Sequence, residues 1–335
     1  MLTYTIRRLI LAIPTLLFIS FVIFLIVKLS PSDPTAGLPL TIPPEVREQI
    51  RESLGVNDPV LIQYFKWLKL MVWDEPLHFI EGTTGWQVAP DGPRIISYQT
   101  RSPVMDLIAQ RMPQTLWVVG TSYIVGILIA LPLGIISAYK QYSVFDQVGT
   151  FISMVGFSVP TFFTGVLFIV IFAVNLGWFP SVYNTTHEVT DWDSFVVQLK
   201  QIVMPVMVLG LFNASQISRY LRASMLDNLN QDYVRTARAK GLSEKTVVLV
   251  HVLKNSMIPV VTVIALNVPA VFGGAIITEQ VFKVNGIGQL LIIAIQSGDV
   301  PVVQTVSFIF AVLIVLFSLI ADILYGVLDP RIRYD

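Results

Sequence analysis

Six long apolar segments constrain the fold of this chain more than any other feature. Each is roughly 18 to 26 residues long, the length of helix that crosses the hydrocarbon core of a bilayer. Only 13% of the 335 residues are charged, against about 25% in typical soluble domains, so lipid is the expected solvent for much of the surface. We therefore predict an all-α membrane protein with about six transmembrane helices. The segments cover residues of about 10–27, 115–138, 149–174, 202–220, 258–281 and 302–326.

The first apolar segment is expected to remain as a helix rather than to be cleaved as a secretory signal peptide. A signal peptide has a short apolar region followed by a small-residue cleavage site. This segment follows Arg7 and Arg8, is longer than such a region, contains Pro14 and ends at Lys28. Residues 1–29 are therefore predicted to form the N-terminal segment and the first transmembrane helix.

Residues 30–112 are polar and rich in proline, and we expect them to form an external region. Apolar residues at helical spacing predict two amphipathic helices there, over residues 43–55 and 59–72. Residues 73–100 are rich in glycine, proline and aromatic residues and are predicted to be an external excursion. Its aromatic side chains either contact a partner protein or form an interfacial aromatic belt. They are Trp73, Phe79, Trp86 and Tyr98.

Basic residues are distributed unevenly between the two sides of the predicted bundle. Six spans place both termini on one side, and the short loops of the opposite side hold only Lys200 and Lys283, with Lys28 at its edge. Because basic residues favour the cytoplasmic side, both termini are predicted to be cytoplasmic, with residues 113–335 forming a five-helix core. The basic residues on the predicted cytoplasmic side are Arg7, Arg8, Lys140, Arg219, Arg222, Arg235, Arg238, Lys240, Lys245, Lys254, Arg331 and Arg333.

The predicted cytoplasmic loop at about residues 221–257 is not composed like a linker. Residues 227–240 contain good helix formers and no Pro or Gly. Gly241 suits the left-handed position that ends a helix. Ser243 can cap a second helix, with Glu244 in its first turn. The sequence therefore predicts a helix, a tight glycine turn and a second helix.

The first loop helix is expected to have two different faces. Tyr233 and Ala237 share one side, whereas Arg235 and Arg238 share another. Small side chains beside Gly241 permit close docking into a groove on a partner protein. A basic loop resting on anionic headgroups has the same pattern, so the residues alone leave both interpretations open.

Several motifs in order along the chain resemble those of one protein family, the inner-membrane permeases of binding-protein-dependent ABC importers. The loop signature of that family is Glu-Ala-Ala, three residues, Gly, nine residues and Ile-x-Leu-Pro, and this chain matches it at Ala237, Gly241 and Leu253. The departures are similar to the dipeptide/oligopeptide/nickel branch, and to the first of its two permeases. Further matching motifs are Arg7-Arg8-Leu9, Ile13-Pro14-Thr15, Ser30-Pro31-Ser32-Asp33-Pro34, Gly156-Phe157-Ser158-Val159-Pro160, Gly274-Ala275-Ile276-Ile277-Thr278-Glu279, Gly286-Ile287-Gly288 and Asp329-Pro330-Arg331-Ile332-Arg333.

The resemblance implies a type I ABC importer-like bundle in the cell inner membrane, with a cytoplasmic coupling helix that docks on an ATP-binding subunit. The implied partners are a second homologous permease, two ATP-binding subunits and an extracytoplasmic substrate-binding protein. This chain lacks the Walker A sequence, so we expect it not to be an enzyme and to bind no cofactor, with ATP and Mg in the partners. The residues expected to carry coupling are Tyr233, Arg235, Thr236, Ala237, Arg238, Gly241 and Leu242.

The expected substrates of the importer are peptides, with oligosaccharides, opines or nickel as alternatives for the same machinery. Candidate residues of the translocation path are Ser158, Asn213, Asn267 and Gln304, although such polar residues also join helices by hydrogen bonds. Glu279 and Asp322 are functional candidates as carboxylates near the ends of spans, but we expect them to lie at the membrane interface. With no cysteine and three distant histidines, no metal site is predicted, and zero net charge gives no pull toward nucleic acid.

A secondary transporter or channel that works without ATP is the alternative of a different class. Such a protein typically has inverted repeats and ionisable residues near the membrane midplane. Neither feature is clear in this sequence. An intramembrane hydrolase would need a convergent nucleophile and base within the spans, and no cysteine or histidine lies in a predicted span.

Overall fold

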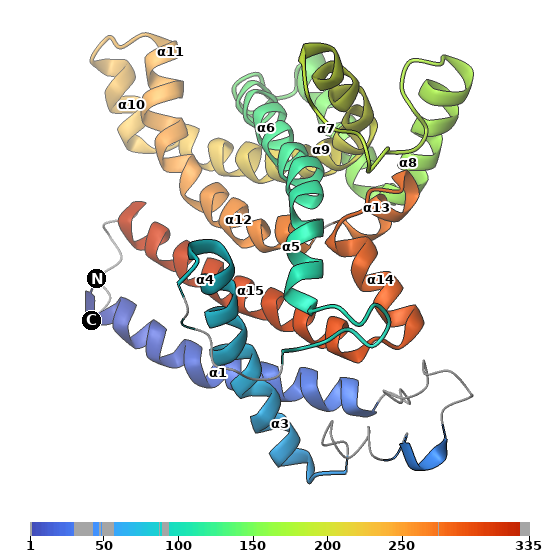
Figure 1. Ribbon diagram of the computed structural model, residues 1–335. Helices are drawn as coiled ribbons and strands as arrows, with labels where there is room; N and C mark the ends of the chain where they lie inside the picture. The colour runs from blue at the N-terminus through green and yellow to red at the C-terminus, as the bar shows by residue number, and fades with distance from the viewer. Residues whose placement is uncertain are drawn as a thin grey trace. The chain divides into compact units, whose positions relative to one another are not determined.

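The computed structural model describes residues 2–29, 43–46, 48, 57–86, 88, 94–273 and 275–328, and within these ranges the chain is helical with no β-strand (Figure 1). The described helices in chain order are α1 (Leu2–Leu29), α3 (Val60–Lys69), α4 (Glu75–Thr84), α5 (Val104–Thr115), α6 (Thr121–Tyr139), α7 (Val144–Ser158), α8 (Thr161–Phe168), α9 (Trp192–Leu229), α10 (Asp232–Ala239), α11 (Glu244–Thr246), α12 (Leu253–Gly273), α13 (Ile276–Phe282), α14 (Ile287–Ser297) and α15 (Val300–Leu328). Four π-helical turns connect some of them: η1 (Leu70–Asp74), η2 (Leu116–Gly120), η3 (Ile169–Asn175) and η4 (Val247–Val252).

The transmembrane prediction is confirmed, with differences at the ends of the spans. In the described part of the chain, five helices are long and apolar enough to cross a membrane. They run over Thr5–Leu29, Val104–Tyr139, Trp192–Leu229, Glu244–Phe272 and Val300–Leu324. Each helix contains most of one predicted segment. Several are longer than the predicted segment, because amphipathic turns continue the helix beyond the apolar residues. The first predicted amphipathic helix, residues 43–55, lies mostly outside the described residues.

The third predicted span is a broken helix rather than a straight one. Residues Val144–Ser158 and Thr161–Asn175 are bent by 103° relative to each other. Pro160 causes the break, because a proline lacks an N–H and pushes the preceding residue out of the helical region. Val159 is accordingly extended, with ψ of 127°. Helices α13 and α14 form a second pair with a sharp bend between them, of 93°. The straight helix of the fifth predicted span ends at Phe272 instead of at residue 281.

Two compact units make up the chain, and each has its own packing. Unit 1 comprises Met1–Arg8, Gln114–Gln289 and Leu316–Asp335, and unit 2 comprises Leu9–Pro113 and Leu290–Val315.

Unit 1 is built around the close pair α6 and α9. A Cβ atom added to Gly126 would lie 2.8 Å from the Cβ of Asn213, and one added to Gly134 would lie 3.0 Å from the carbonyl oxygen of Ser218. Glycines thus let the two backbones approach, as is common where helices pack in membranes. Helix α9 begins at a capping box in which Asp191 accepts a hydrogen bond from Ser194 N. That bond holds the pKa of Asp191 below its usual value.

Unit 2 joins parts of α1 and α15 to the helices α3 and α4. Tyr64 and Trp67 are buried on α3 and contact rings of α1 and α15. This confirms the second predicted amphipathic helix, which begins at Val60 after Pro59. Asp299, in the turn between α14 and α15, accepts hydrogen bonds from the backbone N–H groups of Tyr98 and Gln99 and from the Ser97 hydroxyl. Residues 97–99, in the part of the chain predicted to be external, are therefore tied to this turn.

Candidate functional site

The loop that was predicted to be cytoplasmic forms the expected helix, glycine turn and helix, with shifted boundaries. Helix α9 continues to Leu229, beyond the predicted end of its span, and α10 begins separately at Asp232. After the turn, α11, η4 and α12 run on as one helix into the fifth span (Figure 1). The loop is thus a short helix held between two long membrane helices.

The inner face of α10 is anchored in the core of unit 1. Val234 is fully buried and Ala237 is nearly so. They belong to one apolar cluster with Leu221 and Met225 of α9 and Val247 of η4. The close approach that Ala237 permits is therefore to the chain's own core, which makes α10 a rigid continuation of the bundle.

The outer face of α10 is exposed and carries the predicted cationic residues. Arg235 pairs with Asp232 at 3.2 Å, and Arg238 pairs with Glu244 across the turn at 2.8 Å. Thr236 and Leu242 are exposed beside them. The two faces of the helix thus divide the residues predicted to carry coupling into a buried set and an exposed set.

Gly241 has the backbone conformation that only glycine adopts without strain. Its φ is +77°, and its N–H donates to the carbonyl oxygen of Arg238. Ser243 caps the following helix by accepting a hydrogen bond from Thr246 N, as predicted. Tyr233 donates its hydroxyl proton to Asn228 Oδ1 at 2.8 Å, which ties α10 to the end of α9.

A buried ion pair lies at the base of this loop and was not predicted as a pair. Arg222 of α9 donates from Nε and Nη2 to the carboxylate of Asp146 on α7, at 2.6 and 2.8 Å. Asp146 is 3% exposed and also accepts from the backbone N–H of Tyr142 and the hydroxyl of Thr150. Bidentate Arg–carboxylate pairs are geometrically specific, so this pair fixes α7 and the turn before it to the end of α9.

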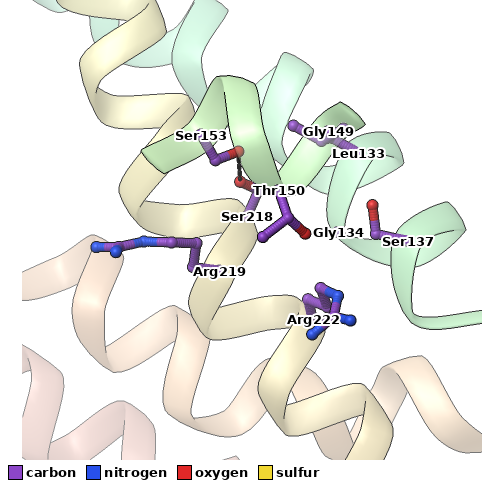
Figure 2. Close-up of a pocket in the computed structure, with 9 residues that line it drawn as sticks. All are labelled: Leu133, Gly134, Ser137, Gly149, Thr150, Ser153, Ser218, Arg219 and Arg222. Carbon is purple, nitrogen blue, oxygen red and sulfur yellow. Dashed lines mark hydrogen bonds between the residues drawn. The ribbon is translucent and has the colours of Figure 1, made fainter. Parts of the chain in front are cut away.

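The same region contains a small cavity between α6, α7 and α9. Figure 2 shows its lining residues, with Ser153 hydrogen-bonded to Ser218 at 3.4 Å and Arg219 extending away from the other side chains. The Arg219 guanidinium instead lies 4.4 Å from the ring centroid of Phe157. The cavity has about 10 Å³ of free volume, enough for about one water molecule. It is therefore a gap in helix packing and too small for a transported solute.

The structure distributes the four candidate path residues instead of gathering them. Ser158 is exposed at the break between α7 and α8, Asn213 is half-buried in α9, and Asn267 donates to the carbonyl oxygen of Val263 within α12. Gln304 is buried in α15 and belongs to unit 2. Ser158 is thus the candidate with an exposed polar side chain at a helix break. The role of all four remains a prediction.

Glu279 is buried among residues of its own chain, which the sequence did not predict, and its position at the membrane interface stays a prediction. It is 1% exposed, and its carboxylate accepts hydrogen bonds from the Thr115 hydroxyl at 3.1 Å and from Gln289 N at 3.0 Å. A Cβ atom on Gly286 or Gly288 would lie 2.5 or 2.9 Å from Glu279 Oε2, so both glycines make room for the carboxylate. A Gly-x-Gly pattern within ten residues of a glutamate is the sequence feature from which this buried carboxylate could have been anticipated.

Asp322, the other carboxylate expected at an interface, is partly exposed and pairs with Arg8 at 3.1 Å. Both residues belong to unit 1. The pair therefore links the start of α1 to α15 near the predicted cytoplasmic end of each.

Comparison with known proteins accounts for the whole chain. Residues 130–334 match the family "Binding-protein-dependent transport system inner membrane component", and residues 1–119 match its N-terminal region, "Binding-prot-dependent transport system membrane comp, N-term". The chain is 38% identical over 342 residues to the oligopeptide transport system permease protein AppB of Bacillus subtilis (strain 168), with 100% of both chains covered. It is 36% identical over 338 residues to the glutathione transport system permease protein GsiC of Salmonella choleraesuis (strain SC-B67), again with 100% of both covered.

Among solved structures, the chain resembles a subunit of the MetNI methionine ABC transporter in an inward-facing conformation. The TM-score is 0.53 at 18% sequence identity, covering 68% of this chain and 99% of the other. At this identity the likeness concerns the fold, which is that of an ABC importer membrane subunit.

Proposed function

This chain belongs to the family of inner-membrane components of binding-protein-dependent transport systems, and from that premise we propose that it forms half of the translocation path of an ATP-driven peptide importer. As a permease of such an importer it works with partner subunits. We assign these as a second homologous permease, two ATP-binding subunits and an extracytoplasmic binding protein.

The observation that carries the mechanism is the two-faced helix α10. Its buried face, Val234 and Ala237, is part of the core formed by α9 and η4. Its exposed face presents Arg235 and Arg238 on a helix of eight residues. A helix anchored on one side and cationic on the other is suited to lie in a groove of a partner and to transmit the partner's movement.

The energy for transport comes from outside this chain in the proposed mechanism. A ligand shifts a conformational equilibrium only by its differential affinity for the two states. ATP supplies that difference in the ATP-binding subunits, and α10 passes their closure to α9 and α12. Tyr233 and Gly241 hold the geometry of the connection, whereas Arg235, Thr236, Arg238 and Leu242 meet the partner.

Peptides are proposed as the transported solute because the full-length relatives are named as oligopeptide and glutathione permeases. Glutathione is itself a small peptide, so the two names share a chemistry. Oligosaccharides, opines and nickel are the alternatives for the same machinery.

The test is to purify a tagged form of this subunit together with the products of its neighbouring genes and reconstitute it in vesicles. The proposal predicts a second permease and ATP-binding subunits in a fixed ratio, and ATP-dependent uptake of labelled di- to hexapeptides with the binding protein added outside. A stable homo-oligomer that conducts or exchanges solute without ATP would overturn the importer mechanism. ATP-dependent uptake of another solute, with peptides excluded, would overturn only the substrate.

A further inference from the structure

The helical segment Val60–Thr84, made of α3, η1 and α4, follows a membrane helix and was expected to lie outside the bilayer. Within unit 2 it packs against α1 and α15. The depth of those contacts along the two membrane helices shows where the segment lies, because helix residues are spaced by about 1.5 Å along the axis.

Helix α3 contacts α1 well inside its membrane-spanning part. Tyr64 shares a hydrogen bond with Ser20 at 2.8 Å, donates to the carbonyl oxygen of Leu17, and packs edge-on against Phe24. These residues lie about 8 to 18 Å from the Leu29 end of α1 at the usual rise per residue. The hydrocarbon core of a bilayer is about 30 Å thick, so Tyr64 sits within it.

A second membrane helix gives the same depth independently. The Trp67 ring lies 5.9 Å from that of Phe24 and 5.5 Å from that of Phe308 on α15, measured between centroids. Phe308 is about 12 Å along α15 from its first residue, Val300. Contacts with α1 and α15 therefore place α3 at one level, roughly a third of the way into the membrane.

Three ion pairs involve Lys66, Lys69, Asp74 and Glu75 of this segment, and pairing lowers the cost of charges in a low-dielectric surrounding. Lys66 contacts Asp58 at 2.6 Å, and Lys69 lies 3.9 Å from Asp74. Glu75 pairs with Arg94 at 3.2 Å and also accepts from Ile95 N. The stems of Lys66 and Lys69 are long enough to reach the headgroup level.

The face turned away from α1 and α15 carries large apolar side chains, with the exposed Lys66 and Lys69 among them. Phe65 and Trp73 are 62% and 64% exposed, and Leu61 and Val72 are exposed beside them. Helix α1 also exposes an apolar surface, since only 11% of its most apolar window is buried. Bulky apolar and aromatic residues with lysines alongside are typical of helices that lie in a membrane interface.

We propose that Val60–Thr84 is embedded in the outer leaflet of the membrane, where Leu61, Phe65, Val72 and Trp73 contact lipid acyl chains. The segment widens the lipid-facing surface of the subunit beside α1 and braces α1 against α15. The aromatic side chains at its end, such as exposed Trp86, then lie at the membrane interface. This inference concerns lipid contact and does not depend on which solute is transported.

The test uses nitroxide labels on single cysteines, which the chain allows because it contains no cysteine. Phe65→Cys and Val72→Cys report on the segment in the assembled importer in phospholipid vesicles. Phe18→Cys, on the exposed apolar face of α1, is the lipid-facing control, and Val189→Cys, in the loop before α9, is the control for water. Retained uptake and subunit recovery show that each variant is folded.

Oxygen concentrates in lipid, whereas a nickel chelate concentrates in water. The rate at which each reagent relaxes the nitroxide therefore shows whether the label lies in lipid or in water. The proposal predicts greater accessibility to oxygen than to nickel at Phe65 and Val72, as at Phe18. Greater accessibility to nickel, as at Val189, would place the segment in water and overturn the proposal. Protection from both reagents would also overturn it, because a protein partner would then cover this face.

Discussion

Breaking the ion pair between Asp146 and Arg222 is predicted to destabilise the subunit far more than breaking an exposed pair. Asp146→Ala leaves a guanidinium that is 26% exposed without its carboxylate, and Arg222→Ala leaves a carboxylate that is 3% exposed. Removing one partner of a buried pair costs about 3–5 kcal/mol. Because Arg222 retains some solvent contact, we expect the lower end of that range, about 3 kcal/mol for each substitution.

The loss is measurable as a shift in unfolding temperature. With an unfolding entropy of about 2.1 cal/mol/K per residue over 335 residues, about 3 kcal/mol corresponds to a decrease of about 4 °C. Independent sites would give about 9 °C for the double variant. Because Asp146 and Arg222 contact each other directly, we expect the double variant to lower the unfolding temperature by only about 4–6 °C. The second substitution removes a side chain that has already lost its partner.

The assay is thermal unfolding of the purified importer, followed by intrinsic tryptophan fluorescence. Asp232→Ala and Arg235→Ala are the matched control, since that pair is exposed on both sides and is expected to contribute below about 1 kcal/mol. The reasoning is refuted if the Asp146 and Arg222 variants lower the unfolding temperature no more than this control does. It is also refuted if the decreases of the two single variants add fully in the double variant, because the pair then does not hold α7 to α9.

Three further predictions follow from buried or constrained positions. Glu279→Ala leaves the Thr115 hydroxyl and Gln289 N without an acceptor. The free energy of unfolding should therefore fall by about 2–5 kcal/mol, and by less for Glu279→Gln. Equal stability of the two variants and the unaltered protein would contradict the role given to the buried carboxylate. Gly286→Ala places Cβ 2.4 Å from Thr115 Oγ1 and should lower the unfolding temperature, whereas Gly82→Ala meets nothing within 4 Å and should not. Gly241→Ala forces a side chain into φ +77° at about 1–2 kcal/mol and should reduce uptake more than recovery of the subunit; unchanged uptake and ATP hydrolysis would show that the turn does not transmit movement.

The membrane helices and the loop geometry were predictable because local properties determine them. Apolar length alone located the spans, and the αL preference of Gly241 and the cap at Ser243 located the turn. The face of α10 that points inward was not predictable. Val234 and Ala237 form the same pattern whether they face a partner's groove or the chain's own core. The apolar side chains that cover this face, on α9 and η4, are brought to it only by the turns on either side of α10.

Differences arose where contacts distant in sequence decide the environment. The place of Glu279 at the end of an apolar segment gave no sign that Thr115 and the glycines at 286 and 288 bury its carboxylate. Segment Val60–Thr84 was predicted to be external because its charges lower its mean hydropathy. The contacts of Tyr64 and Trp67 with two membrane helices, on which its proposed depth rests, could not be read from the sequence. Pro160 was visible in the sequence, but prolines at 132, 205 and 269 lie inside helices, so proline alone does not identify a break.

The measurement that tests the central claim most directly is photo-crosslinking from the exposed face of the coupling loop in the actively transporting importer. A photoreactive phenylalanine analogue at Lys240, which is exposed next to Gly241, is compared with the same analogue at Val189, in the loop before α9. The account predicts an adduct between Lys240 and an ATP-binding subunit, with none from Val189. If the active importer yields no such adduct from Lys240, α10 is not the element through which ATP drives this permease.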